Sequence, residues 1–125
     1  DPVIMENLLA ALGAEAIKFP NRIECCGAHL AMTNEDIVVK LSGNVMTSAV
    51  RNGAELIVTT CPLCQYNLEK SQSRVASDTP GYAGITIVYF TQMLGLALGQ
   101  DVDTLGFDKN MWDARPLLRK KGIIK

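Results

Sequence analysis

Four cysteines are the residues of this 125-residue sequence best suited to chemistry. Cys25 and Cys26 are adjacent, whereas Cys61 and Cys64 enclose two residues, and 34 residues from Gly27 through Thr60 separate the two pairs. Thiolates act as nucleophiles, as redox groups and as ligands for soft metals. The sequence therefore predicts disulfide chemistry, metal binding or both.

The segment Cys61-Pro62-Leu63-Cys64 has two interpretations when it is considered alone. A Cys-x-x-Cys at a strand-to-helix junction is typical of a thioredoxin-like redox pair, but it also supplies half of a metal site. A helix N-terminus would lower the thiol pKa in either case. The second pair, Cys25 and Cys26, favours the metal site because a thioredoxin-type centre has no need of it.

The adjacent pair, Cys25 and Cys26, limits which kinds of centre fit this sequence. Neighbouring cysteines are awkward for a disulfide to each other, since bridged Cα atoms usually lie ~4.4 to 6.8 Å apart. They are also unusual at a structural zinc, where Cys-x-x-Cys recurs in both halves. An iron-sulfur cluster spreads its irons, so neighbouring thiolates can bind different ones, and Gly27 would let the backbone approach it. The remaining alternative is four buried cysteines that act as small hydrophobes.

The N-terminal half is expected to contain two helices and a strand. Asp1-Pro2 provides a cap and an N1 proline for a helix whose apolar residues run from Val3 to Leu12. Ala14–Phe19 alternates in polarity and stops at Pro20, which predicts a short strand. Thr33 or Asn34 can cap a second helix, with an apolar stripe from Ile37 to Ala49 that we expect in the core.

The C-terminal half repeats the strand-to-helix order. Glu55–Thr60 is a β-branched run typical of a buried parallel strand, and Pro62 then opens a helix that ends at the turn of residues 78–81. Residues 85–90 predict a further strand, followed by a helix over Gln92–Leu98 that is capped by Thr91 and expected in the core. Residues 101–125 predict a short helix and an extended tail.

This order predicts an α/β fold: one domain over residues 1–125 with a three-layer, open, mostly parallel, Rossmann-like sheet and helices on both faces. Ligands bind beyond the carboxyl ends of such strands. Both cysteine pairs follow predicted strands, so we expect the four thiols to meet at one edge of the sheet.

Composition excludes several classes of function. Hydrophobic residues make up 48% and charged residues 20%, as in compact soluble domains. A net charge of −1 with scattered Lys and Arg excludes a nucleic-acid footprint. The longest apolar runs fall well short of the roughly 20 residues that cross a bilayer, so we expect no direct membrane span. Four cysteines are too few for a disulfide scaffold, which favours the cytoplasm.

The cysteine pattern resembles the second part of the cysteine-rich CCG domain. This domain occurs in the B-type subunit of heterodisulfide reductase and its relatives, including an unusual succinate dehydrogenase subunit and thiol-fumarate reductase. Residues 89–99 resemble the strand and helix that follow in those subunits, and residues 115–118 resemble their tail. The family pattern has a further cysteine, farther upstream than the 24 residues that precede Cys25 here. The resemblance thus implies an N-terminally incomplete domain, the C-terminal part of its parent, whose missing ligand lies outside this chain.

The resemblance implies a noncubane 4Fe-4S cluster held by Cys25, Cys26, Cys61 and Cys64, which cleaves a small-molecule disulfide as electrons arrive one at a time. Iron-sulfur and flavin subunits would deliver these electrons, and any association with a membrane would come through such partners. The alternatives are an electron-relay or assembly domain of a succinate dehydrogenase/fumarate reductase-type complex, or a structural zinc-binding module. The isolated chain is expected to be inactive. Its cysteines would hold an incomplete cluster or zinc, or would hold no metal and be oxidised to disulfides.

Two other side chains carry weaker functional interpretations. His29 follows Cys26 by three residues and could give a proton to a departing thiolate, although a lone loop histidine is also a common structural residue. Trp112, near Arg115, could mark a contact with a partner subunit or pack on its own domain.

Overall fold

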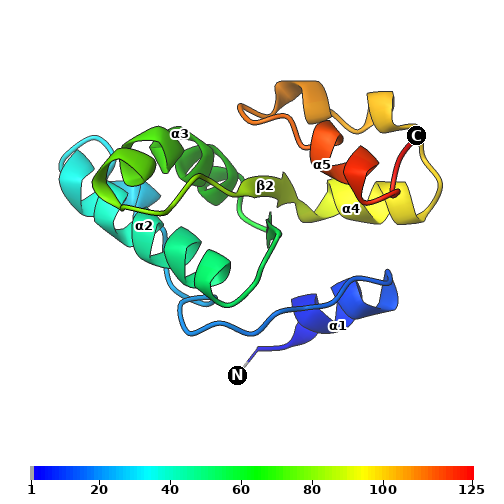
Figure 1. Cartoon of the computed structure of the whole chain (residues 1–125), viewed down its shortest axis with the longest axis horizontal. Helices are drawn as coiled ribbons and strands as arrows, with labels where there is room; N and C mark the ends of the chain where they lie inside the picture. The colour runs from blue at the N-terminus through cyan, green and yellow to red at the C-terminus, as the bar shows by residue number, and fades with distance from the viewer. Residues whose placement is uncertain (1) are drawn as a thin grey trace.

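The computed structural model describes residues 2–125 (Figure 1). The principal elements are α1 (Ile4–Ala11), α2 (Glu35–Arg51), β1 (Leu56–Thr59), α3 (Pro62–Asp78), β2 (Thr86–Tyr89), α4 (Phe90–Ala97) and α5 (Arg115–Lys120). Three short 3-10 turns add η1 (Ala28–Leu30), η2 (Val102–Thr104) and η3 (Phe107–Lys109).

Local signals placed most of these elements correctly. The predicted N1 proline of α1 is wrong, because the helix begins at Ile4 with Val3 as its N-cap, and the predicted cap residue Asp1 lies outside the described residues. The Asn34 side chain accepts a hydrogen bond of 3.1 Å from the amide of Ile37, which confirms one of the two predicted caps for α2. Pro62 is the first residue of α3, where its missing N–H leaves no donor unsatisfied. α4 begins earlier than predicted, because Tyr89, rather than Thr91, is its N-cap. Gln92 accepts a hydrogen bond of 2.9 Å from the Tyr89 amide and so fixes this start.

The sheet is smaller than predicted. β1 and β2 run parallel, with Leu56 beside Thr86 and Thr59 beside Tyr89, and α3 forms the crossover between them. Across residues 2–125 the sheet contains these two strands. The chain is therefore a mixed α/β domain, and the predicted three-layer Rossmann-like arrangement is not confirmed.

The predicted strand over Ala14–Phe19 is wrong. These residues form a loop and belong to no sheet, and the segment makes its main-chain bonds locally, as from Ala14 to Leu9 and from Arg22 to Phe19. An alternating pattern forms a strand only where another strand supplies hydrogen bonds. Instead, Phe19 packs against the core, and Arg22 pairs with Glu6 of α1 at 3.0 Å. The adjacent cysteines thus follow a loop rather than a strand.

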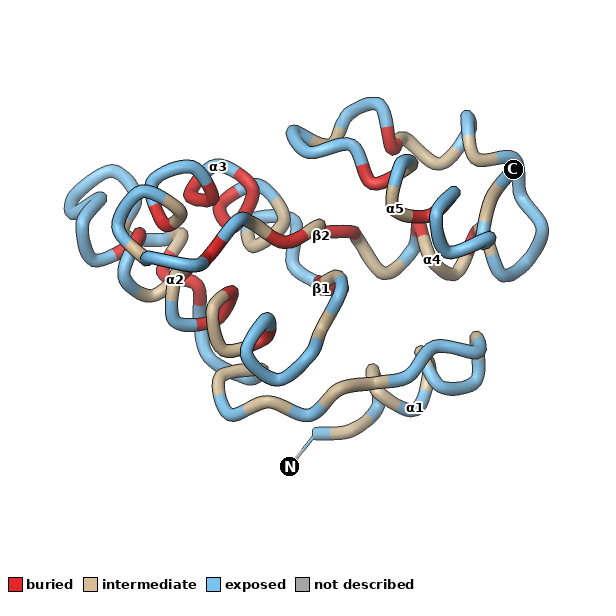
Figure 2. Tube along the Cα trace, viewed as in Figure 1, coloured by how far each residue is buried: buried red, intermediate tan, exposed pale blue. Residues whose placement is uncertain are grey.

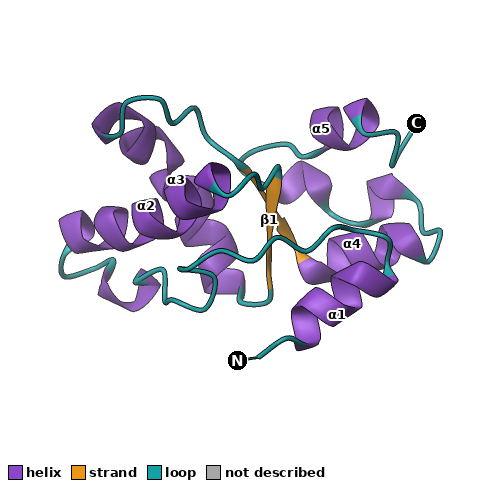
Figure 3. Cartoon of the chain, turned by 60° about the horizontal axis from the view of Figure 1, so that its bottom comes forward, coloured by secondary structure: helices purple, strands orange, loops and turns teal. Residues whose placement is uncertain are grey.

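The two faces of the sheet carry separate cores. Ile57 and Ile87 point into a cluster with α2 and α3, whereas Val58 and Val88 point into a cluster with α4, η3 and α5. This division follows the two-residue period of a strand. Figure 2 shows the buried residues along β2 and on the facing sides of α2 and α3, and Figure 3 shows the strands between the two groups of helices.

Two predicted apolar stripes extend beyond the core. Ile37 at the start of α2 is 43% exposed, and Leu98 at the end of α4 is 71% exposed. Each lies at a helix end, where helical periodicity continues but the packed surface has already stopped. The central residues of the α2 stripe, such as Met46 and Ala49, are fully buried as expected.

Side-chain amides cover the outer edge of β2. Gln72 of α3 bonds both main-chain groups of Ile85: its Oε1 accepts from the amide at 3.0 Å, and its Nε2 donates to the carbonyl. Gln65 Nε2 donates to the Ile87 carbonyl at 3.1 Å. These glutamines take the place of a neighbouring strand, so α3 holds the sheet edge by hydrogen bonds as well as by packing.

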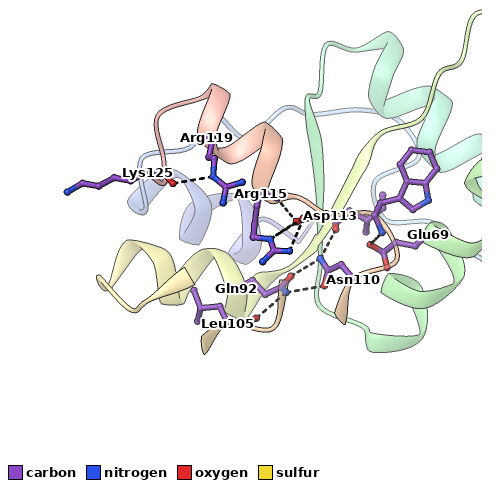
Figure 4. Close-up of polar contacts among 10 residues, drawn as sticks. Glu69, Gln92, Leu105, Asn110, Asp113, Arg115, Arg119 and Lys125 are labelled. Carbon is purple, nitrogen blue, oxygen red and sulfur yellow. Dashed lines mark hydrogen bonds and ion pairs between the residues drawn. The ribbon is translucent and has the colours of Figure 1, made fainter. Parts of the chain in front are cut away.

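The C-terminal segment is attached to this framework by polar contacts (Figure 4). The buried carboxylate of Glu69 accepts hydrogen bonds from the amides of Met111 at 3.0 Å and Trp112 at 3.4 Å, and burial raises its pKa. Gln92 Nε2 donates to Leu105 O at 3.2 Å and to Asn110 Oδ1 at 3.1 Å. The Trp112 ring lies against Gly84, so this side chain packs at least partly on its own domain.

Replacement of Gln72 by alanine should destabilise the fold by about 3 kcal/mol, because it leaves the buried N–H and C=O of Ile85 without partners. Chemical denaturation measures the change. The neighbouring Ser73→Ala, at an exposed position of α3, should stay within about 0.5 kcal/mol of the original protein. A loss below about 1 kcal/mol in the Gln72 variant would show that the edge does not depend on this side chain.

Candidate metal centre

Two of the four predicted thiols meet in the folded chain. Cys26 Sγ lies 3.3 Å from Cys64 Sγ, although the residues are 38 positions apart. Cys26 belongs to the loop before η1 and is 3% exposed, whereas Cys64 lies in the first turn of α3 and is half-buried. The two cysteine pairs therefore meet, as expected, at the contact between Cys26 and Cys64.

Cys61 joins the same group from the N-cap position of α3. It makes no ordinary N-cap hydrogen bond, but the amide of Cys64, the Cys64 thiol and the amide of Leu63 lower the pKa of Cys61. Burial, followed by the contact with Cys26, raises the pKa of Cys64. The helix start therefore favours a thiolate at the exposed Cys61 and a neutral thiol at Cys64.

Cys25 occupies a different position. Its side chain is exposed, and its sulfur accepts a hydrogen bond from the amide of Gly27 at 3.4 Å and lies 3.9 Å from Nδ1 of His29. Within the described part of the chain, no three His, Cys, Asp or Glu side chains are arranged to hold a metal ion. The structure places Cys64 in contact with both Cys26 and Cys61, and ligation by all four cysteines stays a prediction.

A buried polar cluster fixes the backbone of Cys26. The hydroxyl of Ser42 and the amide group of Asn67 each donate to the Cys26 carbonyl at 3.1 Å, and Asn67 also donates to Ser42 Oγ at 2.9 Å. Ser42 comes from α2 and Asn67 from α3, and both are at least 96% buried. The loop is thereby attached to both helices, which holds the Cys26 sulfur against Cys64.

Sequence reasoning missed the role of these two residues. The detectable signal was a polar residue on an apolar helical stripe: Ser42 lies between Leu41 and Val45, and Asn67 lies at helical spacing from Leu63. A polar side chain on a buried face needs a hydrogen-bond partner. The sequence alone does not identify the Cys26 carbonyl as that partner.

Gly27 is required by its contact with α2. Its φ is +80°, and a Cβ at this position would lie 2.8 Å from Cδ1 of Leu41. Both the left-handed backbone and the close approach favour glycine. The structure therefore gives a local reason for the glycine, and the approach of this backbone to a cluster stays a prediction.

The sulfur donors suit a thiophilic metal centre. Cys64 lies in contact with Cys26 and Cys61 at a helix start, and thiolates select zinc, copper(I) or iron-sulfur clusters. Sulfurs around a tetrahedral zinc lie about 3.8 Å apart for metal–sulfur bonds of about 2.3 Å. The sulfurs of Cys26 and Cys64 would therefore have to move only slightly farther apart to bind one ion. Cys25 would have to turn away from His29 to join them.

Parallel strands flanked by helices, with thiols gathered at a helix start, define a cysteine-rich domain suited to metal or disulfide chemistry. The sequence profile of the cysteine-rich CCG domain family matches residues 2–69, which include all four cysteines. The chain therefore belongs to the CCG cysteine-rich domain family.

Several curated proteins are similar to the chain. The 8-methylmenaquinol:fumarate reductase membrane anchor subunit of Wolinella succinogenes is 32% identical over 117 residues, which cover 94% of this chain and 41% of that protein. The B-type subunit of the ferredoxin/F(420)H(2)-dependent CoB-CoM heterodisulfide reductase of Methanosarcina acetivorans is 32% identical, with coverage of 87% and 37%. A protein of Archaeoglobus profundus that is named as like the heterodisulfide reductase B-type subunit is 33% identical, with coverage of 81% and 34%.

The chain spans 34 to 41% of the length of these three relatives. One of them is named as a membrane anchor subunit. Among the helices of residues 2–125, none is long and apolar enough to cross a membrane.

The two thiols of α3 should differ in reactivity toward iodoacetamide when the protein is metal-free and reduced. Cys61 should react at a lower pH than an ordinary thiol because the helix amides favour its thiolate, whereas Cys64 should require a higher pH because burial disfavours its charge. Mass spectrometry of peptides labelled over a range of pH measures both rates. Faster labelling of Cys64 than of Cys61 at neutral pH would contradict this order.

Proposed function

We propose that this chain supplies the cysteine ligands of an iron-sulfur centre in an oxidoreductase like the B-type subunit of heterodisulfide reductase, which transfers electrons and reduces a disulfide. The observation that carries the proposal is the 3.3 Å contact between Cys26 and Cys64, beside Cys61 at the same helix start. Membership of the CCG family and the heterodisulfide reductase relatives support the redox role.

In this proposal Cys25, Cys26, Cys61 and Cys64 hold a noncubane 4Fe-4S cluster, together with a cysteine from outside this chain. When bound, the cluster would supply one-electron redox chemistry at iron next to a sulfur substrate. The protein contributes a fixed Cys26 through Ser42 and Asn67, and α3 supplies two thiols whose pKa values differ. Isolated from its parent, the chain would be inactive and could hold zinc or no metal.

The partners follow from the same class of protein. Iron-sulfur and flavin subunits would deliver the electrons, and a small-molecule disulfide or thiol would be the substrate. We place the complex in the cytoplasm, with any membrane association through partner subunits. The wider three-layer sheet would require strands from the rest of the parent protein.

Two alternatives have specific support. The fumarate reductase subunit of Wolinella succinogenes covers 94% of this chain, which favours an electron-relay or assembly domain in a succinate dehydrogenase/fumarate reductase-type complex. A structural zinc module is favoured by the short Cys26–Cys64 distance, since a single ion gathers its sulfurs closely.

Anaerobic reconstitution of the full-length protein with iron and sulfide separates these possibilities. We expect the absorption and electron paramagnetic resonance signals of a cluster, and Cys61→Ser and Cys64→Ser should each abolish or strongly change them, because each removes a thiolate ligand. Ser73→Ala, about 14 to 18 Å along α3 from these thiols, is the matched control.

Three results distinguish the proposed function from its alternatives. Zinc retention without any iron-sulfur signal would reject both redox functions. A cluster with no turnover of a heterodisulfide would favour the relay. Unchanged spectra in both cysteine variants would reject this site.

His29 has a separate test. Its ring nitrogen lies 3.9 Å from Cys25 Sγ, a position from which it could pass a proton to a leaving thiolate. His29→Asn should therefore lower disulfide turnover by about 10²-fold without loss of the cluster spectrum. Equal turnover in the variant would assign His29 a structural role.

A further inference from the structure

We propose that Cys26 and Cys64 form a disulfide when the metal is absent, and that this bond closes the centre to metal until a thiol reduces it. The disulfide rests on the geometry of this chain alone. Its effect on metal binding rests on the proposed function, because it requires that these two thiols are ligands.

The two sulfurs are already held close to bonding position. Their separation is 3.3 Å, so a bond of about 2.05 Å requires an approach of about 1.2 Å. Ser42 and Asn67 fix the Cys26 carbonyl, and Cys64 lies in the first turn of a long helix.

The other possible pairs are less favourable. Cys25 and Cys26 are adjacent, so a bond between them would strain the peptide, and the Cys25 sulfur faces Gly27 and His29. Cys61 and Cys64 form the main competitor, since both lie at the start of α3. Cys61, however, is exposed at the N-cap, whereas Cys26 is 3% exposed and held against Cys64 by two buried hydrogen bonds to its own carbonyl.

A small disulfide such as oxidised glutathione can drive the reaction. Cys61 is the exposed thiol at the start of α3, so its thiolate attacks one sulfur of the small disulfide and releases one thiolate. Cys64 then attacks the Cys61 sulfur and releases the second small thiolate. Cys26 finally attacks the Cys64 sulfur, which forms the Cys26–Cys64 bond and releases Cys61 as a thiolate. Two electrons pass from the protein thiols to the small disulfide, and the two thiol protons end on the two released thiolates.

The consequence for the centre is loss of two of its four donors in this chain. A disulfide sulfur is no longer a thiolate ligand, so only Cys25 and Cys61 would remain. The oxidised protein would then bind no thiophilic metal, and a reducing thiol would restore binding. The thiol-disulfide balance of the surroundings would thereby control loading of the site.

Peptide mapping of the metal-free, full-length protein tests the bond. The protein is equilibrated with graded ratios of reduced and oxidised glutathione, alkylated, and analysed by mass spectrometry. We expect Cys26–Cys64 as the main disulfide among these four cysteines, with Cys25 and Cys61 alkylated. Cys61→Ser should retain this disulfide and Cys64→Ser should lose it.

Asn67→Ala tests the pre-positioning, because it frees the Cys26 loop while leaving every thiol in place. Disulfide formation should slow several-fold in this variant, whereas Ser73→Ala should leave the rate unchanged. A Cys61–Cys64 bond as the main product, only mixed disulfides with glutathione, or an equal rate after Asn67→Ala would overturn the proposal.

Cobalt(II) tests the effect on metal binding, since thiolate ligation gives a charge-transfer band. The reduced protein should show this band, the oxidised protein should lose it, and a reducing thiol should restore it. Equal cobalt binding by the oxidised and reduced forms would overturn the proposed closure. If the disulfide forms but the reduced protein never binds cobalt, the metal-site function fails while the disulfide stands.

Discussion

The carbonyl oxygen of Cys26 is the point on which the arrangement of the site depends. Two buried donors, one from α2 and one from α3, satisfy this oxygen at the same distance of 3.1 Å. The loop that carries the adjacent cysteines has no strand before it to set its path. These hydrogen bonds, together with the left-handed Gly27 against Leu41, define where the loop lies. The contact between the Cys26 and Cys64 sulfurs is a result of that placement.

Helix α3 connects the site to the rest of the molecule. Cys61 is its N-cap, its first turn supplies Cys64, its middle supplies Asn67 and Glu69, and Gln72 follows one turn later. Successive faces of one helix thus hold the thiols, the cysteine loop, the C-terminal segment and the edge of β2. Movement of this helix would change all four contacts together. Its buried polar residues Asn67, Glu69 and Gln72 each make one of these contacts by hydrogen bonds.

Features governed by neighbouring residues could be predicted from the sequence. The Asn34 cap, the Pro62 start of α3, and the two β-branched strands all depend on local chemistry, and each appears close to its predicted position. The spacing of the four cysteines also identified the family correctly.

Features governed by distant partners could not be predicted. The segment 14–19 has the alternation of a strand, but no strand supplies its hydrogen bonds. The roles of Ser42 and Asn67 depend on an oxygen that lies 16 and 41 residues away along the chain. Such pairings follow from tertiary packing, which a single sequence does not reveal.

The amides that cover β2 also determine how the sheet can grow. Gln72 and Gln65 occupy the main-chain groups that an incoming strand would need on that side, which protects the protein from edge-to-edge association there. The opposite edge, along β1, has no main-chain partner from another segment of residues 2–125. Any further strand that paired with β1 would therefore extend the sheet in one direction only.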